Sequence, residues 1–514
     1  MERRGSSGSG RFGASPSMRR EGPALWEAAA RHIFSPTAAP LPPEVSRAEY
    51  MRFESADFHG IGRSKTVPMR NAHKPVFLYS GAAAMGPRSA LSMPPEVKAL
   101  GCPNTQIIPD WSTARLVEHA PGRPTARVLC DQTWTDGRPM PSCPRHVLRT
   151  ALESLAATAP EGAEGEGAKL LAACEYEFTL CDVAPANGDD DGGGLTLTPA
   201  FGGVDIFNTM QNAKTAEFQQ ELDRSLLTMG VDLQTLNAEY GVGQLEITYS
   251  PHFGLDAGDA AFTFKGAVKE IAQNHRRRAT FMTRPFADAD GASNGGHTNM
   301  SVWCGETNLL QDDDAPDGLS EYGRHFLAGM LEHARALQAL AAPTVNCYHR
   351  VQLDSWAPVV ASWGFDNRTC MVRVKTPKTC PGCASAYFEW RQPGSAANPY
   401  IVLAGAVAAG VDGVQRKLGP NLPPPATGYH YDAVRGDAAA KTEHEWIPTS
   451  LRRALDAFKQ VRAARARARA RRSCEHPGAA RSRGGAGVRK GTHAHAHSGA
   501  SARAGTDARA ICRM

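Results

Sequence analysis

The chain has 514 residues, which is enough for two or three domains with sizeable cores. Its apolar share of 42% is ordinary for a globular protein, and its formal net charge is only +5. Because many of the arginines gather near the two ends, the overall charge does not indicate a nucleic-acid partner.

Both ends of the chain have the composition of disordered segments. Residues 1–44 begin with a Gly/Ser/Arg-rich stretch in which only residues 24–34 predict a helix, and residues 459–514 are a low-complexity Arg/Ala/His/Gly-rich tail. The first residues lack the apolar core of a signal peptide, and the longest uncharged apolar run, 401–411, is too short to span a bilayer. We therefore expect a cytoplasmic protein without a membrane partner.

Residues 45–145 predict a small mixed-β domain. Residues 51–58 alternate in polarity, a Gly-containing turn follows, and residues 63–68 predict the returning strand of a hairpin. Further strand-like segments lie at 105–108, 114–117 and 125–131, with little helix between them.

Residues 146–458 mix helices with short strands, which makes the expected fold class α+β. Helical periodicity is present at 145–157, 215–230, 256–281, 321–341 and 396–418. The short strands between these helices carry charged residues, which predicts a sheet with one face that lines a functional site.

The twelve cysteines are scattered without the spacing of a disulfide framework, which fits reduced thiols. Cys380-Pro-Gly-Cys383 is a single C-x-x-C motif, and no second pair follows at zinc-ribbon spacing. We interpret it as a loop with two free thiols rather than as a zinc site.

The strand Cys174–Phe178 holds two carboxylates, Glu175 and Glu177, on one face, because side chains two apart on a strand point the same way. Two like charges in an apolar setting are costly unless a cation lies between them. Taken alone, the pair is better explained by a solvated edge strand whose glutamates face water. The later positions favour a metal site.

Four further residues extend this pair. Glu239 and Glu246 flank a Gly-rich turn, His297 follows a Gly-rich loop, and Glu389 lies on an apolar strand. Five carboxylates and one histidine suffice for two divalent ions with three protein ligands each, and hard oxygen ligands suit Mg²⁺ or Mn²⁺.

Four arginines lie in or beside apolar strand-like segments, where an unpaired arginine is rare. The guanidinium fork binds phosphate and carboxylate bidentately, so metals together with an arginine cluster indicate phosphoryl transfer. No Walker loop or Rossmann glycine motif is present. The arginines are Arg350, Arg368, Arg373 and Arg391.

The order of these motifs along the chain resembles that of glutamine synthetases of the bacterial (class I) type. The motifs are the Glu-x-Glu strand, the Gly-Gln turn between two glutamates, the histidine after a Gly-rich loop, an Asn-Arg pair and a Glu-x-Arg strand. The resemblance covers about residues 45–458. Several segments, such as 53–68, 125–131, 243–247 and 397–404, resemble the lengsin branch of that family most.

The resemblance implies a β-grasp-like N-terminal domain followed by a large catalytic α/β domain with a curved antiparallel sheet. It implies a γ-glutamyl ligase that uses ATP, glutamate and ammonia or an amine, assembled as a dodecamer in which one subunit's N-terminal domain closes its neighbour's site.

The resemblance also implies a role for each candidate residue. One Mg²⁺ or Mn²⁺ would be held by Glu177, Glu239 and Glu246, and the second by Glu175, His297 and Glu389. Glutamate would bind Arg350, the transferred phosphate would contact Arg368 and Arg391, and ATP would contact Arg373, Arg368, Asn299 and Ser301.

The chain departs from the family pattern at Trp356, where the enzyme places a glutamate beside the ammonium. This leaves the identity of the acceptor amine open, and an amine larger than ammonia, stacked on or shielded by Trp356, is consistent with the sequence. The alternative implied by the lengsin likeness is a catalytically silent structural protein with a cytoskeletal, intermediate-filament partner of lens-type cells. The helices expected after residue 458 are replaced by the Arg/Ala tail.

Overall fold

The structure is a computed structural model that describes residues 42–86, 93–161, 167–185, 195–203, 205–286, 291–437 and 445–462. The predictions for residues 1–41, including the helix at 24–34, and for the tail beyond residue 462 lie outside the described residues. Residues 451–462 form a helix, which continues a short distance past residue 458.

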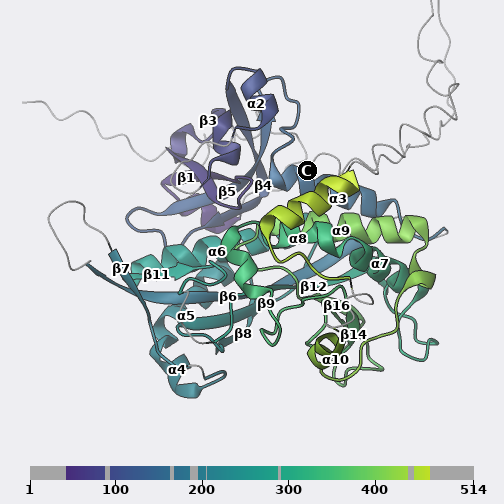
Figure 1. Cartoon of the computed structure of the whole chain (residues 1–514). Helices are drawn as coiled ribbons and strands as arrows, with labels where there is room; N and C mark the ends of the chain where they lie inside the picture. The colour runs from purple at the N-terminus through teal and green to yellow at the C-terminus, as the bar shows by residue number, and fades with distance from the viewer. Residues whose placement is uncertain are drawn as a thin grey trace, which may run out of the picture.

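The first part of the chain forms a five-stranded sheet, which lies above the larger body in Figure 1. The order is β2-β1-β5-β4-β3, with β1 and β5 parallel and the other neighbours antiparallel. The predicted hairpin is confirmed. The strands are β1 (Tyr50–Ala56), β2 (Gly62–Pro68), β3 (Val76–Tyr79), β4 (Asn104–Leu116) and β5 (Thr125–Trp134).

The segments predicted as two strands, 105–108 and 114–117, are one long strand, β4. Its pairing with β5 shifts register between Asp110 and Arg115. A bulge of this kind interrupts the alternation of side chains, which is why local pattern divides the strand in two.

The larger body contains an eleven-stranded sheet with the main path β14-β15-β16-β12-β6-β9-β8. All neighbours on this path are antiparallel except β14 and β15. The path strands are β6 (Lys169–Pro185), β8 (Leu233–Ala238), β9 (Gln244–Tyr249), β12 (Gly296–Cys304), β14 (Trp363–Phe365), β15 (Val372–Lys375) and β16 (Tyr387–Trp390). The remaining strands pair with β6 or β12 and are β7 (Leu195–Pro199), β10 (His252–Phe253), β11 (Arg277–Thr280) and β13 (Thr307–Asn308).

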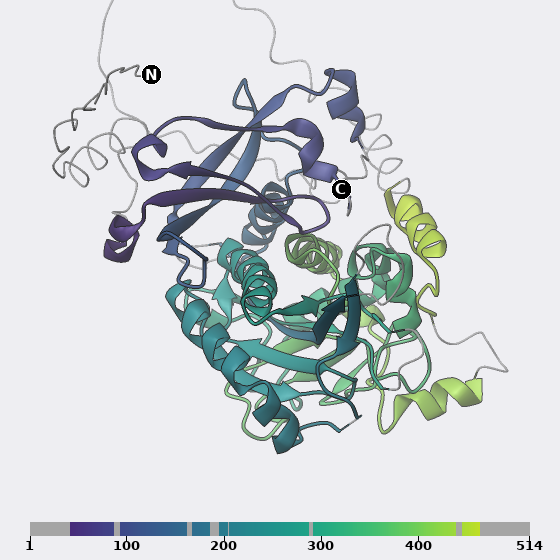
Figure 2. The same cartoon turned by 90° about the vertical axis from the view of Figure 1, so that its left-hand side faces the viewer.

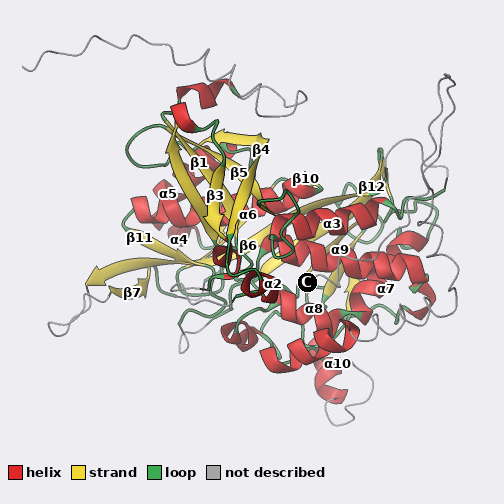
Figure 3. Cartoon of the chain, turned by 90° about the horizontal axis from the view of Figure 1, so that it is seen from above, coloured by secondary structure: helices red, strands yellow, loops and turns green. Residues whose placement is uncertain are grey.

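A layer of helices covers one face of this sheet. In Figure 1, α3, α8 and α9 lie above β6 and β12, and Figure 3 looks down on the same layer. The layer consists of α3 (Pro144–Ala156), α6 (Leu255–Asn274), α7 (Glu321–Glu332), α8 (Ala334–Ala341) and α9 (Pro399–Arg416). Further helices are α2 (Pro95–Ala99), α4 (Thr209–Lys214), α5 (Ala216–Thr228) and α10 (His430–Asp437).

The sheet presents its apolar side chains to these helices. Met300 and Val302 of β12 and Phe388 and Trp390 of β16 share a buried cluster with residues of α3, α7, α8 and α9. Since side chains alternate along a strand, the residues between them, including Glu389, point to the opposite face. The helical layer therefore forms the core, and the other face of the sheet is left for polar side chains.

Two helix predictions are wrong in part. The predicted helix 256–281 ends at Asn274, because Arg276 has a left-handed φ of +58° and Arg277–Thr280 pairs with β6 as β11. The predicted helix 321–341 is interrupted at His333 and forms α7 and α8.

The small sheet rests on α6, as the turned view in Figure 2 shows. Arg52 of β1 pairs with Glu270 at 3.0 Å, and Arg127 of β5 donates a hydrogen bond of 2.5 Å to Thr263. These contacts fix the five-stranded sheet to the helical layer. Within the described ranges, we find no helix with the length and apolar character that crossing a membrane requires.

Candidate active site

The face of the large sheet opposite the helices carries the predicted metal ligands. Residues directly opposite each other in an antiparallel pair share a face. The register places His297 of β12 opposite Glu175 of β6, and Glu177 of β6 opposite Glu246 of β9. Three neighbouring strands therefore direct these four side chains to one surface.

The same surface continues across two further strands. Asn299, two residues after His297 on β12, lies opposite Glu389 of β16, and Glu389 lies opposite Arg373 of β15. The acidic residues of β9, β6 and β16 thus share one face with Arg373 of β15, and β12 adds His297, Asn299 and Ser301 between β6 and β16.

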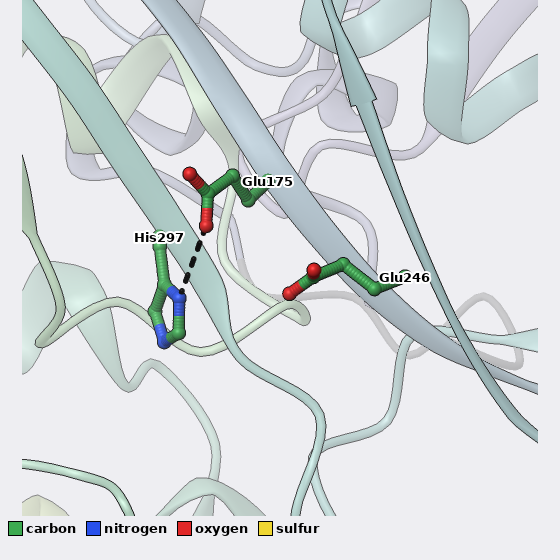
Figure 4. Close-up of side chains that lie close together, drawn as sticks. All are labelled: Glu175, Glu246 and His297. Carbon is green, nitrogen blue, oxygen red and sulfur yellow. Dashed lines mark ion pairs between the residues drawn. The ribbon is translucent and has the colours of Figure 1, made fainter. Parts of the chain in front are cut away.

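Glu175, Glu246 and His297 form a group of possible metal ligands on this face. One ligand atom from each lies within 4.8 Å of the other two. Figure 4 shows the three side chains converging from neighbouring strands, with Glu175 Oε2 3.6 Å from His297 Nδ1. This spacing suits shared coordination of one small cation.

The carboxyl groups around this cluster hold their protons more firmly than usual. Burial, followed by repulsion from Glu177, raises the pKa of Glu246 to about 9 and that of Glu239 to about 7. Burial also raises the pKa of Glu177. The metal-free face is therefore short of positive charge at its acidic end, and a divalent cation with hard oxygen ligands fits this donor set.

His297 is a neutral histidine that lies between an arginine, Arg350, and the carboxylates of Glu175 and Glu389. Burial, followed by Arg391 and Arg350, lowers its pKa well below the ordinary range. Arg350 Nη2 lies 3.1 Å from His297 Nε2, and arginine can only donate, so Nε2 accepts. The ring proton therefore resides on Nδ1, which faces Glu175 and Glu389 at 3.6 and 3.8 Å.

Arg350 ends the short 3₁₀ helix Val345–Arg350 and is buried. Its guanidinium donates to the carbonyl oxygens of Gln392 and Arg391 at 3.2 and 3.0 Å, besides its contact with His297. Burial lowers its pKa to about 10. Its position beside Glu177 and His297 is thus fixed by the backbone that follows β16.

Glu389 is fully buried and its charge is matched by two arginines. Arg373 Nη1 donates to Oε2 at 2.8 Å, and Arg391 Nη1 contacts Oε1. Burial and the charge of Glu175 would raise the pKa of Glu389, but Arg391, His297 and Arg373 together lower it. Arg373 is also held by Asp366, at 2.9 Å from its Nε. This end of the face is therefore ionised.

Two amides that the sequence prediction missed hold Glu177 in place. Gln244 Nε2 and the backbone nitrogen of Gly295 each donate to Glu177 Oε2 at 2.8 Å. Gln244 also donates to Asn294, whose own amide donates to Thr179 at 3.0 Å. A lone buried amide has no sequence signature, so only the tight Gly-Gln turn could have indicated Gln244.

Trp356 and Arg368 lie on loops beside this face. Trp356 has a left-handed φ of +58°, is 46% exposed, and accepts a hydrogen bond of 3.2 Å from Arg391 Nη2 at its carbonyl oxygen. Its ring meets Tyr429 edge-to-face at 6.2 Å between centroids. Arg368 is exposed, and its charge lowers the pKa of both Glu239 and His297.

A comparison with protein families decides the assignment. The sequence profile of "Glutamine synthetase, catalytic domain" matches residues 141–474, which is more than half of the chain. The chain belongs to the glutamine synthetase family. This confirms the resemblance drawn from the strand carboxylates and the Gly-rich histidine loop.

Relatives within the glutamine synthetase family are named as ligases and synthetases, and one carries the name lengsin. A glutamate–isopropylamine ligase of Pseudomonas sp is 35% identical over 323 residues, 63% of this chain and 67% of that protein. A glutamine synthetase of Thermus thermophilus is 30% identical over 419 residues, 80% of this chain and 86% of that protein. A lengsin of Rattus norvegicus is 30% identical over 382 residues, 72% of this chain and 63% of that protein.

A solved structure has the same fold. The structure described as a GmaS/ADP complex superposes with a TM-score of 0.66 at 27% identity, covering 84% of this chain and 89% of that chain. The expected α+β fold of the glutamine synthetase type is therefore confirmed. The β-grasp description of the small sheet and the domain boundaries at 44, 145 and 458 stay predictions.

The sheet brings most of the predicted site residues of this glutamine synthetase family member onto one face. The group whose ligand atoms lie within 4.8 Å of one another, however, joins Glu246 to Glu175 and His297, whereas the resemblance assigns Glu246 to the other ion. Ser301 is buried and accepts a hydrogen bond of 2.8 Å from Trp303 Nε1. Asn299 donates to Glu175 Oε1 at 2.7 Å. The division of ligands between two ions and the nucleotide contacts stay predictions.

Proposed function

We propose that this glutamine synthetase family member is an ATP-dependent γ-glutamyl ligase that joins glutamate to ammonia or an amine. The observation that carries the proposal is the row of carboxylates on a protected sheet face, with pKa values raised to about 7 and 9 at Glu239 and Glu246. A chain that kept only the fold would have no physical reason to retain such costly groups.

Two divalent ions, Mg²⁺ or Mn²⁺, are proposed for this face. The first would be held by Glu177, Glu239 and Glu246, and the second by Glu175, His297 and Glu389. When bound, they would neutralise the charge of the phosphates. The carboxyl groups of Glu239 and Glu246, whose pKa values are raised to about 7 and 9, would have to be deprotonated to act as ligands, so binding is expected to release protons.

The chain's own residues would align the reactants. In the proposed reaction the γ-carboxylate of glutamate attacks the terminal phosphorus of ATP, which gives γ-glutamyl phosphate and ADP. Arg350 would bind glutamate, Arg368 and Arg391 would balance the transferred phosphate, and Arg373 would bind the other phosphates. The amine then attacks the acyl carbon and expels phosphate.

The nucleotide is proposed to lie along β12 beside Asn299 and Ser301. The similar structure described as a GmaS/ADP complex supports a nucleotide in this fold. Assembly as a dodecamer, with the small sheet closing a neighbour's site, is proposed on the family resemblance alone.

The acceptor is proposed to be an amine larger than ammonia. The aromatic pair Trp356 and Tyr429 lies beside the arginine end of the face, and an exposed indole attracts an alkylammonium through its π-face. The relative named glutamate–isopropylamine ligase supports an amine acceptor.

The second candidate is the silent structural protein with a filament partner that the likeness to lengsin suggests. It shares the fold but requires no cation on the acidic face. The retained row of carboxylates favours the enzyme.

Phosphate release from ATP distinguishes the two. The full chain is assayed with Mg²⁺ and glutamate, with ammonium, methylamine and isopropylamine as separate acceptors, and Glu177→Ala as the inactive control. Acceptor-dependent release by the wild-type chain alone is the expected result. No release from a folded chain that also fails to bind ATP would favour the structural protein.

A further inference from the structure

The C-x-x-C motif lies at the exposed tip of the connection between β15 and β16. Cys383 N donates to Cys380 O at 3.1 Å, and Gly382 between them has a φ of +87°. With proline at the second position and a left-handed glycine at the third, this is a type II β-turn. The two cysteines therefore occupy the corners of one tight turn.

A β-turn of this kind brings its first and last Cα atoms within about 7 Å, and disulfides join Cα atoms about 4.4–6.8 Å apart. The two side chains are also near enough for Cys380 to raise the pKa of the Cys383 thiol. Both cysteines are free and partly exposed. Oxidation would join the two sulfurs with little movement of the backbone.

The base of the turn is anchored. Cys380 N donates to Thr376 O at 2.9 Å, and Thr376 Oγ1 donates to Asp317 O at 2.7 Å. Lys378 Nζ also donates to Ala315 O at 2.8 Å. These contacts hold Cys380 in a fixed place, so little conformational freedom has to be lost before the two sulfurs can bond.

No other described cysteine has these properties. Seven of the ten are buried, and Cys102, the third that is partly exposed, has Met93 as its sulfur neighbour at 3.2 Å. The groups of three or more possible metal ligands found among the described residues do not include Cys380 or Cys383. The pair is thus suited to thiol chemistry rather than to a closed zinc site, which needs four ligands.

We propose that Cys380 and Cys383 are a reversible dithiol–disulfide site that reacts with small disulfides of the glutathione class. The thiolate of Cys380 attacks one sulfur of the small disulfide, forming a mixed disulfide and releasing one thiolate. Cys383 then loses its proton and attacks the Cys380 sulfur, which expels the second thiolate. The protein dithiol is oxidised by two electrons, and the small disulfide is reduced to two thiols.

The order of the two cysteines follows from their surroundings. Burial, and then the neighbouring Cys380 thiol, raises the pKa of the Cys383 thiol to about 11, so Cys383 is the poorer first nucleophile and we assign the first attack to Cys380. A four-residue loop gains little chain-entropy stabilisation from a cross-link, so the disulfide should be readily reduced. The pair can therefore be oxidised to the disulfide and reduced back to two thiols.

The turn closes the hairpin that carries two residues of the proposed active site. Lys375 and Tyr387 are paired next to the turn, and Arg373 and Glu389 are the following pair on the same face. A disulfide would restrain this end of the hairpin. The redox site itself does not rest on the proposed ligase function.

The test is mass spectrometry of the full chain equilibrated with reduced and oxidised glutathione and then quenched with acid. Cys474 and Cys512, outside the described residues, are first replaced by serine. Trypsin releases residues 379–391, a peptide that contains no other cysteine. The expected product is this peptide with two hydrogens lost and no glutathione, while Cys102, the matched single thiol, carries at most a glutathione adduct.

Single variants test the assigned order. In samples quenched before equilibrium, Cys383→Ser should accumulate glutathione on Cys380 at least about tenfold faster than Cys380→Ser accumulates it on Cys383, because the first attacking thiol is then trapped as the mixed disulfide. Equal adducts on both variants, or glutathione on both cysteines of the wild-type peptide without a disulfide, would overturn the proposal. Zinc bound in stoichiometric amount and lost in both variants would overturn it as well.

Discussion

Replacing Glu246 by glutamine should stabilise the metal-free protein and weaken its response to metal. Burial, and then repulsion from Glu177 and Glu175, raises the pKa of Glu246 from 4.5 to about 9. Between these values the folded chain binds more protons at this site than the unfolded chain does. The stability contributed by Glu246 is therefore present below pH 4.5 and is lost progressively as the pH rises toward 9.

The size of the effect follows from the distance between the ordinary pKa and the assay pH. Each pH unit between 4.5 and 7 lowers the free energy of unfolding by about 1.36 kcal/mol. At pH 7 the metal-free protein is therefore roughly 3 kcal/mol less stable through this group than it is below pH 4.5. Glu246→Gln removes the titration while keeping the shape. We expect the variant to gain roughly 2–3 kcal/mol at pH 7 and less than about 1 kcal/mol at pH 5.

Urea unfolding with EDTA, and then with Mg²⁺, measures these differences. The exposed Glu306→Gln variant, in the turn after β12, is the matched control and should leave both midpoints unchanged. With Mg²⁺ the order should reverse, because wild type gains from binding and the variant has lost a ligand. If Glu246→Gln were less stable than wild type at pH 7 without metal, the reasoning about this face would be refuted.

Three other substitutions test separate parts of the account. Glu177→Ala should lower metal-dependent ATP turnover by at least about 100-fold, and an unchanged rate would remove Glu177 from the metal site. Trp356→Glu should raise the ratio of kcat/KM for ammonia over isopropylamine by about tenfold, and no change would exclude Trp356 from acceptor choice. Lys265→Met should cost roughly 2 kcal/mol in urea unfolding, because Lys265 Nζ donates to Ser395 O and Ala397 O at 2.8 Å each, whereas the exposed Lys269→Met should cost little.

Alternation along single strands was enough to predict which residues of each strand face the site. The Glu175/Glu177 pair, the apolar neighbours of Glu389 and the polar face of the histidine strand all follow from period-two pattern. The register between strands does not follow from that pattern. That Glu389 lies opposite both Asn299 and Arg373 depends on pairing between segments up to about ninety residues apart in sequence.

The wrong helix end at 275–281 has a similar origin. Ala279 lies seven residues after the buried Ala272 and so continues a helix-like spacing, but Arg277–Thr280 instead adds to the far part of β6 as β11. Hydrogen bonds to a strand about a hundred residues earlier outweigh local preference here. The hydrogen-bond partners of the charged site residues could not be predicted from the sequence either. Asp366, Gln244 and Asn294 are single polar residues, and their contacts depend on the assembled sheet.

The most direct test of the central claim is a count of divalent ions bound per chain, made by titrating metal-free protein with Mn²⁺. The account predicts two ions on the wild-type chain and fewer on Glu177→Ala. His333→Ala alters the other described group of possible ligands, Glu332, His333 and Asp412, and should leave the count unchanged. A folded wild-type chain that binds no Mn²⁺, or a count that Glu177→Ala leaves unchanged, would contradict the claim that the acidic sheet face is a two-metal site.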